Sequence, residues 1–184
     1  MLNFLIVYGT TEGHTRKVAE FVQDHVRSLG YTARVMDSTH LPDDLDLAHY
    51  EGYFLLGSLH QGAHQKSLIH FARRYRGELI ERPSAFLSIS LTAAYPDGGH
   101  QEELDRCANK FFEETDWYPT MWSPVAGALK YLEYDWLKKM VLRSISKKAG
   151  GDTDMSQDYE YTNWASLAAF VDNFIAQCFT VAEL

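Results

Sequence analysis

A turn rich in glycine and threonine, Gly9-Thr10-Thr11-Glu12-Gly13-His14-Thr15, carries the residue types that bind phosphate. It lies between a short apolar run and a segment with helical periodicity. The N-terminus of a helix offers unpaired N–H groups and a partial positive charge, and successive N–H groups in a tight turn form an anion-binding nest. The threonine hydroxyls add donors, and Gly13 permits close approach. We therefore predict a phosphate-binding loop; the alternative is a polar helix cap without a ligand.

Two well-known phosphate loops are excluded by the residues present. A mononucleotide loop needs Gly-Lys-[Ser/Thr], but His14 follows Gly13, and a dinucleotide fingerprint needs a GxGxxG pattern that is absent. The remaining pattern resembles the flavodoxin phosphate loop, [Ser/Thr]-x-Thr-Gly-x-Thr, which holds FMN. Thr10, Gly13 and Thr15 match it, whereas Glu12 puts a carboxylate where a hydroxyl is usual. We expect that carboxylate to point away from the phosphate, so that only the N–H of Glu12 is a donor.

Two further loops are expected to complete the site, residues 57–64 and 90–99, because each follows an apolar strand. In a doubly wound sheet the ligand binds outside the carboxyl ends of the strands, where strand order reverses. Glycines allow a flavin ring to approach the backbone, and Tyr95 suits stacking. The predicted FMN contacts are Thr10, Thr11, Glu12, Gly13, His14, Thr15, Gly57, Ser58, Leu59, His60, Gly62, Ser90, Leu91, Thr92, Ala93 and Tyr95.

The elements that must position these loops alternate along the chain. Short apolar runs predict strands at residues 2–8, 53–56 and 85–91, alternation of apolar and polar residues predicts one at 31–36, and residues 121–126 fit a fifth that Pro124 interrupts. Four segments with helical spacing lie between or after them. Their predicted inner faces are Val18, Val22, Val26 and Leu29; Leu68, Ile69, Phe71 and Ala72; Leu104, Cys107, Ala108, Phe111 and Phe112; and Trp164, Leu167, Ala168, Val171, Ile175 and Cys178. Gly30 is expected to end the first helix and Thr162 to cap the last.

This alternation predicts an α/β fold, because parallel strands need helical crossovers. We expect one domain, residues 1–184, with a flavodoxin-like doubly wound sheet of five parallel strands in the order 2-1-3-4-5. Between Gly127 and the last helix lie roughly 35 residues, far more than an ordinary loop of about 4–6. We assign residues 130–158 to an insertion after or within the fifth strand.

Composition narrows the class of protein. The formal charge of −8 argues against a nucleic-acid binder, which needs a basic footprint. No apolar run approaches the length of about 18 residues that spans a bilayer. The two cysteines, Cys107 and Cys178, belong to no CxxC pair and are expected to be buried thiols. With no secretion signal evident, these features indicate the cytoplasm.

Three segments resemble one particular family. They are residues 127–131 (GALKY), 149–154 (AGGDTD) and 159–164 (YEYTNW). They are similar to the flavodoxin-domain family that includes the quinone-dependent protoporphyrinogen oxidase of haem biosynthesis, and the similarity extends over the whole chain. The resemblance implies an FMN oxidoreductase that takes electrons from a tetrapyrrole, protoporphyrinogen IX, and passes them to a membrane quinone such as menaquinone. The family's Arg-Tyr-Gly after the third strand is absent here, and Asn163 replaces an aspartate.

The insertion carries a basic island in an acidic protein. Residues 130–148 hold six Lys or Arg and two acidic residues, together with a group of aromatic and aliphatic side chains around Trp136 and Met140. We expect an interfacial helix on an anionic membrane surface, which would place the protein peripherally on the inner face of the cell membrane. The alternative is a helix packed on its own domain with a solvated basic face.

His60 and His64 are the candidate catalytic residues, since both fall near the expected edge of the flavin and histidine transfers protons at neutral pH. Their spacing of four also suits a metal pair, but no third ligand accompanies them, and no metal site is predicted. Surface or hydrogen-bonded histidines are the alternative. Two rival functions stay open, an electron-carrier flavodoxin and a general flavin-dependent quinone reductase.

Overall fold

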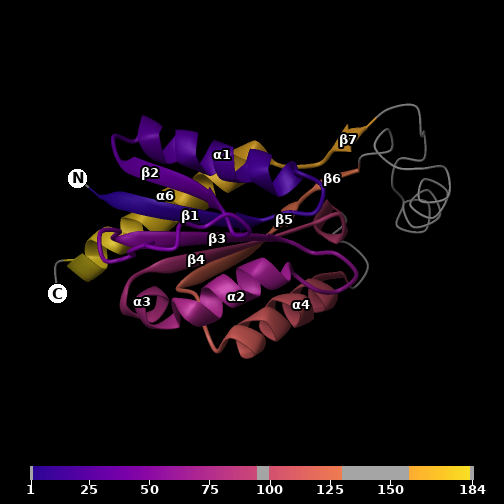
Figure 1. Cartoon of the computed structure of the whole chain (residues 1–184). Coiled ribbons are helices and arrows are strands. Elements are labelled where there is room, and N and C mark those ends of the chain that lie inside the picture. The colour runs from indigo at the N-terminus through magenta and orange to yellow at the C-terminus, as the bar shows by residue number, and fades with distance from the viewer. Residues whose placement is uncertain (1, 95–99, 130–157, 183–184) are drawn as a thin grey trace.

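A five-stranded parallel sheet forms the centre of the computed structural model, which describes residues 2–94, 100–129 and 158–182 (Figure 1). Its strand order is β2-β1-β3-β4-β5, as predicted. The strands are β1 (Asn3–Gly9), β2 (Thr32–Asp37), β3 (Gly52–Ser58), β4 (Ser84–Ser90) and β5 (Met121–Ala126). The central strands β1, β3 and β4 are buried along nearly their whole length, because helices cover both faces of the sheet.

Helices cover the sheet in two layers, with α1 and α6 on one face and α2, α3 and α4 on the other (Figure 1). Their bounds are α1 (His14–Ser28), α2 (Lys66–Arg74), α3 (Arg76–Glu81), α4 (His100–Thr115) and α6 (Trp164–Ala182), and a short 3-10 turn, η1, spans Thr92–Ala94. Each layer encloses its own apolar core. Phe4, Phe54 and Phe174 lie at the centre of one, and Phe86, Phe111 and Trp117 at the centre of the other.

The strand order reverses between β1 and β3, which both pair in parallel with the strands beside them. After β1 the chain crosses to β2 on one side, and β3 then lies on the other side of β1. Gly9, the last residue of β1, is in register with Gly57 near the end of β3. The loops that follow these two strands therefore diverge from a common point at the carboxyl edge of the sheet.

The fifth strand is an edge strand, which explains how it accommodates Pro124 without losing its pairing with β4. After it, β6 (Ala128–Leu129) and β7 (Tyr159–Glu160) form a two-stranded antiparallel pair. The predicted insertion thus begins after β5 and not within it. Residues 130–157, the basic island included, lie outside the described residues, and so does Tyr95. In the described part of the chain, none of the helices has the length and apolarity to cross a membrane.

Two details of the predicted elements are wrong. Leu29 was expected on the inner face of the first helix, but it is 42% exposed, because the helix ends at Ser28 and Gly30 turns the chain with φ 87°. Thr162 was expected to cap the last helix. The cap is the side chain of Asn163, whose Oδ1 accepts the N–H of Ser166 at 3.0 Å, because the hydroxyl of Thr162 is used elsewhere.

Candidate functional site

The N-terminus of α1 is built to receive an anion. Its N-cap is Gly13, which adopts φ 84° and has no side chain to bond the first turn, and that first turn contains no acidic residue. The N–H of Gly13 donates to Oγ1 of Thr10 at 2.9 Å. Because Thr10 accepts that hydrogen bond, its own hydroxyl hydrogen is left to donate to another group. The positive end of the helix dipole and a threonine donor therefore meet at this turn.

Thr15 carries a polar group that the described structure leaves unsatisfied. Its side chain is 0% exposed, and Oγ1 has no hydrogen-bond partner in the described structure. A buried hydroxyl without a partner costs about 1–3 kcal/mol, so such groups are rare unless a ligand or water completes them. An acceptor such as a phosphate oxygen would satisfy the hydroxyl of Thr15.

The second loop follows β3 and folds tightly over residues 60–63. His60 and Ala63 exchange backbone hydrogen bonds of 2.9 and 3.1 Å, while Gln61 and Gly62 take positive φ values of 51° and 75°. His60 is exposed. Leu59 is held by its N–H bond to the carbonyl of Ile89 at 2.7 Å, which fixes the start of this loop to β4. The loop therefore presents backbone and an exposed imidazole at the carboxyl edge.

The third loop begins at Ser90, whose buried hydroxyl accepts the N–H of Ala93 at 3.2 Å and so starts the turn η1. The carbonyl of Ser90 also accepts the N–H of Gly127 at 2.9 Å. Leu91, Thr92 and Ala93 are therefore attached to the point where the chain leaves β5. The three loops predicted from the sequence do emerge together from the carboxyl ends of β1, β3 and β4.

His64 belongs to the core and not to the crevice. It is 7% exposed, its Nε2 lies 2.9 Å from Oγ of Ser88, and its ring packs edge-on against Phe86 and Phe111. Burial, with a smaller effect from the nearby Lys110, lowers the pKa of His64 to about 4. The imidazole is therefore neutral at physiological pH. This is the hydrogen-bonded histidine that the sequence left as an alternative.

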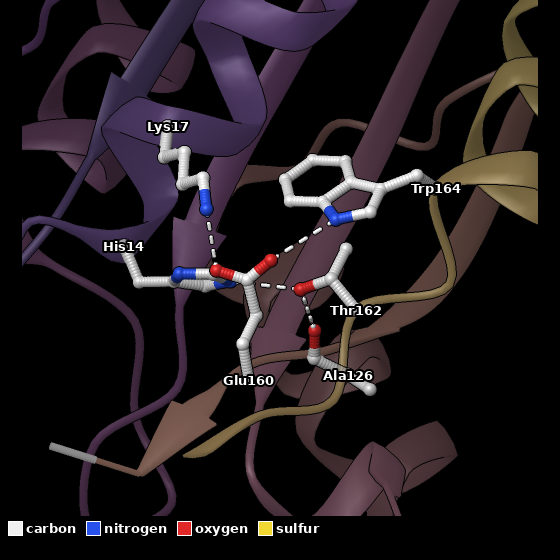
Figure 2. Close-up of polar contacts among 6 residues, drawn as sticks. All are labelled: His14, Lys17, Ala126, Glu160, Thr162 and Trp164. Atoms are coloured by element: carbon white, nitrogen blue, oxygen red, sulfur yellow. Dashed lines mark hydrogen bonds and ion pairs between the residues drawn. The ribbon is translucent and has the colours of Figure 1, made fainter. Parts of the chain in front are cut away.

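The side chain of His14 points toward Thr162, on the chain that returns from β7 (Figure 2). The hydroxyl of Thr162 donates to the carbonyl of Ala126 at 2.7 Å. Its single hydrogen is thereby used, so Nε2 of His14, at 2.8 Å, must be the donor to Thr162. The side chain of His14 connects α1 to the end of β5. Any contact of His14 with a ligand at the turn would therefore come from its backbone.

Glu160 ties the same returning chain to the first turn of α1 (Figure 2). Its carboxylate accepts from Nζ of Lys17 at 2.5 Å and from Nε1 of Trp164 at 3.0 Å, and the ammonium of Lys17 lies 5.4 Å from the centre of the Trp164 ring. Burial raises the pKa of Glu160, but these hydrogen bonds and the charge of Lys17 outweigh it, so the pKa is lowered overall. The anion site and β7 are thus fixed to one another.

Sequence reasoning missed two residues at the site, Gln65 and Lys17. Nε2 of Gln65 donates to Oγ1 of Thr11 at 3.0 Å and to Oγ of Ser58, which joins the first loop to the second. A glutamine directly before a helical segment suggests no more than a helix start. Its partner Thr11 is 54 positions away, and Lys17 and Glu160 are 143 positions apart, so no local pattern could have paired them.

The residues present fit a phosphate-bearing flavin. The site combines an uncapped helix N-terminus, a buried hydroxyl that lacks a partner, and glycines at the ends of β1 and β3. A side chain at Gly57 would lie 2.9 Å from the ring of His64, so this position is restricted to glycine by packing. Together, the fold and these loops define a doubly wound α/β protein of the flavodoxin type.

The chain belongs to the flavodoxin domain family, whose model matches residues 5–156. It is 29% identical over 166 residues to protoporphyrinogen IX dehydrogenase (quinone) of Escherichia coli K12, with 90% of this chain and 91% of that protein covered. It is 31% identical over 175 residues to the protein of the same name from Leishmania major, with 94% and 74% covered. The resemblance predicted from the sequence motifs, that of an oxidoreductase, is confirmed. Family membership supports a flavin as the cofactor.

Solved structures agree on the fold. A short-chain flavodoxin associated with a bacterial microcompartment superposes with a TM-score of 0.57 at 12% identity, covering 97% of this chain and 99% of that one. Oxidised flavodoxin 1 from Bacillus cereus gives 0.53 at 13% identity, covering 95% and 97%. At this level of identity the likeness establishes the architecture and nothing about the ligand.

Proposed function

We propose that this protein binds FMN at the N-terminus of α1 and uses it to oxidise protoporphyrinogen IX to protoporphyrin IX, with a membrane quinone as acceptor. The observation that carries the proposal is the buried, unpartnered hydroxyl of Thr15 in an uncapped first turn. The names of the relatives from E. coli and L. major supply the substrate and the acceptor.

The chain's own residues have separate roles in this proposal. Thr10 and Thr15 would donate to the phosphate, together with backbone N–H groups of the turn other than that of Gly13, which bonds Thr10. The flavin ring would be held by the loop after β3, through Gly57, Ser58, Leu59 and Gly62, and by the loop after β4, through Ser90, Leu91, Thr92 and Ala93. FMN, when bound, supplies two-electron redox chemistry, so the six-electron oxidation of the porphyrinogen takes three cycles. His60, exposed beside the ring, is the residue we assign to move a proton at neutral pH.

Reconstitution and one assay test the proposal. Apo-protein incubated with FMN should acquire the visible absorption band of an oxidised flavin after gel filtration. The loaded protein should then consume protoporphyrinogen IX under nitrogen, faster than a buffer blank, when a menaquinone analogue is added. A colourless protein would remove the cofactor proposal. A coloured protein that leaves porphyrinogen unchanged would keep the cofactor and remove the substrate.

That second outcome would favour one of the two rival functions. A general flavin-dependent quinone reductase would reduce the quinone when supplied with another reductant, such as a nicotinamide cofactor. An electron-carrier flavodoxin would exchange electrons with a redox protein and leave the free quinone unreduced. The same loaded protein distinguishes the two in parallel assays.

The proposed acceptor also requires access to a membrane. The charge pattern of residues 130–148 supports attraction to anionic headgroups, at about 1 kcal/mol per basic residue near the surface. Deletion of residues 130–148 should abolish sedimentation with phosphatidylglycerol vesicles while FMN stays bound. Equal sedimentation of the deletion variant and the intact chain would contradict this membrane contact.

A further inference from the structure

Gln65 lies where the two sides of the crevice meet. It directly precedes α2, in an extended conformation with φ −62° and ψ 134°. Its carboxamide bonds Thr11, in the loop after β1, and Ser58, at the end of β3. One side chain therefore spans the point at which strand order reverses, between the loop expected to hold phosphate and the loop expected to flank the ring.

The direction of these two bonds decides what Thr11 and Ser58 can do. Both bonds use Nε2, which only donates, so each hydroxyl oxygen acts as an acceptor toward Gln65 and keeps its own hydrogen for another partner. The carbonyl oxygen, Oε1, is buried and has no hydrogen-bond partner in the described structure.

Gly9 keeps this carboxamide in place. A Cβ at Gly9 would lie 3.0 Å from Cβ of Gln65 and 3.1 Å from its Oε1, closer than ordinary contacts allow. The glycine at the end of β1 therefore provides the space that Gln65 fills. With two hydrogen bonds on one side and the backbone of β1 on the other, the carboxamide is held in a single orientation.

We propose that Gln65 is a positioning residue of the flavin site, which fixes the hydroxyls of Thr11 and Ser58 as donors toward the ligand. The inference rests on the proposed FMN site. The hydroxyl of Thr11 donates a hydrogen bond to the phosphate, and the hydroxyl of Ser58 donates one to the part of the flavin beside the β3 loop. Hydroxyl donors that are oriented before the ligand binds lose little conformational freedom on binding. They therefore contribute more affinity than hydroxyl groups that rotate freely in the apo-protein.

Affinity measured by quenching of flavin fluorescence tests this. Gln65→Leu should raise the Kd for FMN about ten-fold, by loss of oriented donors. The matched control is Gln23→Leu, which also removes a half-buried carboxamide. Gln23 lies in the middle of α1, and its Nε2 donates to the carbonyl of Ala33 at 2.9 Å. The control should leave the Kd for FMN unchanged, and thermal melts should show that both variants are folded.

A double-mutant cycle shows whether Gln65 acts through Thr11. Thr11→Val alone should also raise the Kd for FMN, by up to ten-fold, and the double variant should bind little worse than Gln65→Leu, because the loss of Gln65 already removes the oriented donor of Thr11. Riboflavin, which lacks the phosphate, should bind equally well to the wild type and to Thr11→Val. Ten-fold effects that multiply in the double variant would overturn the inference.

Two further outcomes separate this inference from the proposed function. A wild-type protein that binds neither FMN nor riboflavin removes the proposed function. A wild type that binds FMN, with Gln65→Leu no weaker than Gln23→Leu, removes only the role of Gln65. If Gln65→Leu fails to fold, Gln65→Glu replaces it. Its carboxylate accepts from both hydroxyls and repels the phosphate, so it should weaken FMN by about 100-fold and riboflavin far less.

Discussion

Thr15→Val is the sharpest test of the anion site, because its two effects should have opposite signs. Valine has the shape of threonine, so the change replaces the buried Oγ1 by a methyl group and leaves the packing intact. In the apo-protein this removes a polar atom that has no partner. An unsatisfied buried hydroxyl costs about 1–3 kcal/mol, so the free energy of unfolding of the apo-protein should rise by about 1 kcal/mol.

Binding of FMN should weaken in the same variant. A hydrogen bond to a charged group contributes about 1.5–3 kcal/mol, so the loss of the Thr15 donor should raise the Kd for FMN by about 10- to 150-fold. Urea unfolding of the apo-protein and a fluorescence titration with FMN measure the two effects separately.

Thr115→Val is the matched control. Thr115 is equally buried in a helix, but its hydroxyl donates to the carbonyl of Phe111 at 2.7 Å, with the carbonyl of Phe112 at 3.3 Å. This variant should lose about 0.5–1.5 kcal/mol of stability and bind FMN as the wild type does. If Thr15→Val instead destabilises the apo-protein as Thr115→Val does, and FMN binds unchanged, the reasoning about the phosphate site is refuted.

Three other predictions follow from the packing around the site. His64 has a lowered pKa in the folded protein, so the unfolded chain binds more protons between pH 6.5 and about 4, and stability should fall by up to ~3 kcal/mol as pH drops through that window. Urea midpoints for His64→Gln should show a flatter pH dependence; an unchanged slope would contradict this. Gly57→Ala should lower stability by about 1–3 kcal/mol, because a Cβ there would lie 2.9 Å from the ring of His64. Gly77→Ala is its control: a Cβ at Gly77 would have no atom within 4 Å, so this change should raise stability by about 0.5–1 kcal/mol. Thermal melts measure both changes. Glu160→Gln should cost no more than ~1 kcal/mol at pH 7, since the ion pair with Lys17 is exposed. Because the pKa of Glu160 is lowered in the folded protein, this difference should vanish in acid below that pKa, and a difference that persists there would rule out a charge effect.

The fold could be predicted from the sequence because each element has its own signal. Short apolar runs such as residues 2–8 are typical of strands buried on both faces, and the 3.6-residue spacing of Val18, Val22 and Val26 indicates the inner face of α1. The errors came at helix ends. Leu29 continues the apolar spacing but lies beyond the last turn, and Thr162 is a good N-cap residue whose hydroxyl is used by Ala126 and His14.

Only those features of the candidate site that depend on residues close together in the sequence could be predicted. The turn at residues 9–15 has a recognisable composition, so its loop and the helix behind it were placed correctly. The position and contacts of each side chain depend on partners that are distant in the sequence. His64 lies beside the crevice in sequence, yet the space beside Gly57 and the hydroxyl of Ser88 draw its ring into the core. Gln65 enters the site for the same reason, through contacts that no spacing rule contains.

The pair of short strands β6 and β7 fixes both ends of the chain between them. Ala128 and Leu129 stand opposite Glu160 and Tyr159. Neighbours across an antiparallel pair are about 5 Å apart, a gap that a two-residue hairpin turn closes. The positions of the sheet, the helices and the turn at residues 9–15 therefore do not depend on how many residues separate Leu129 from Tyr159.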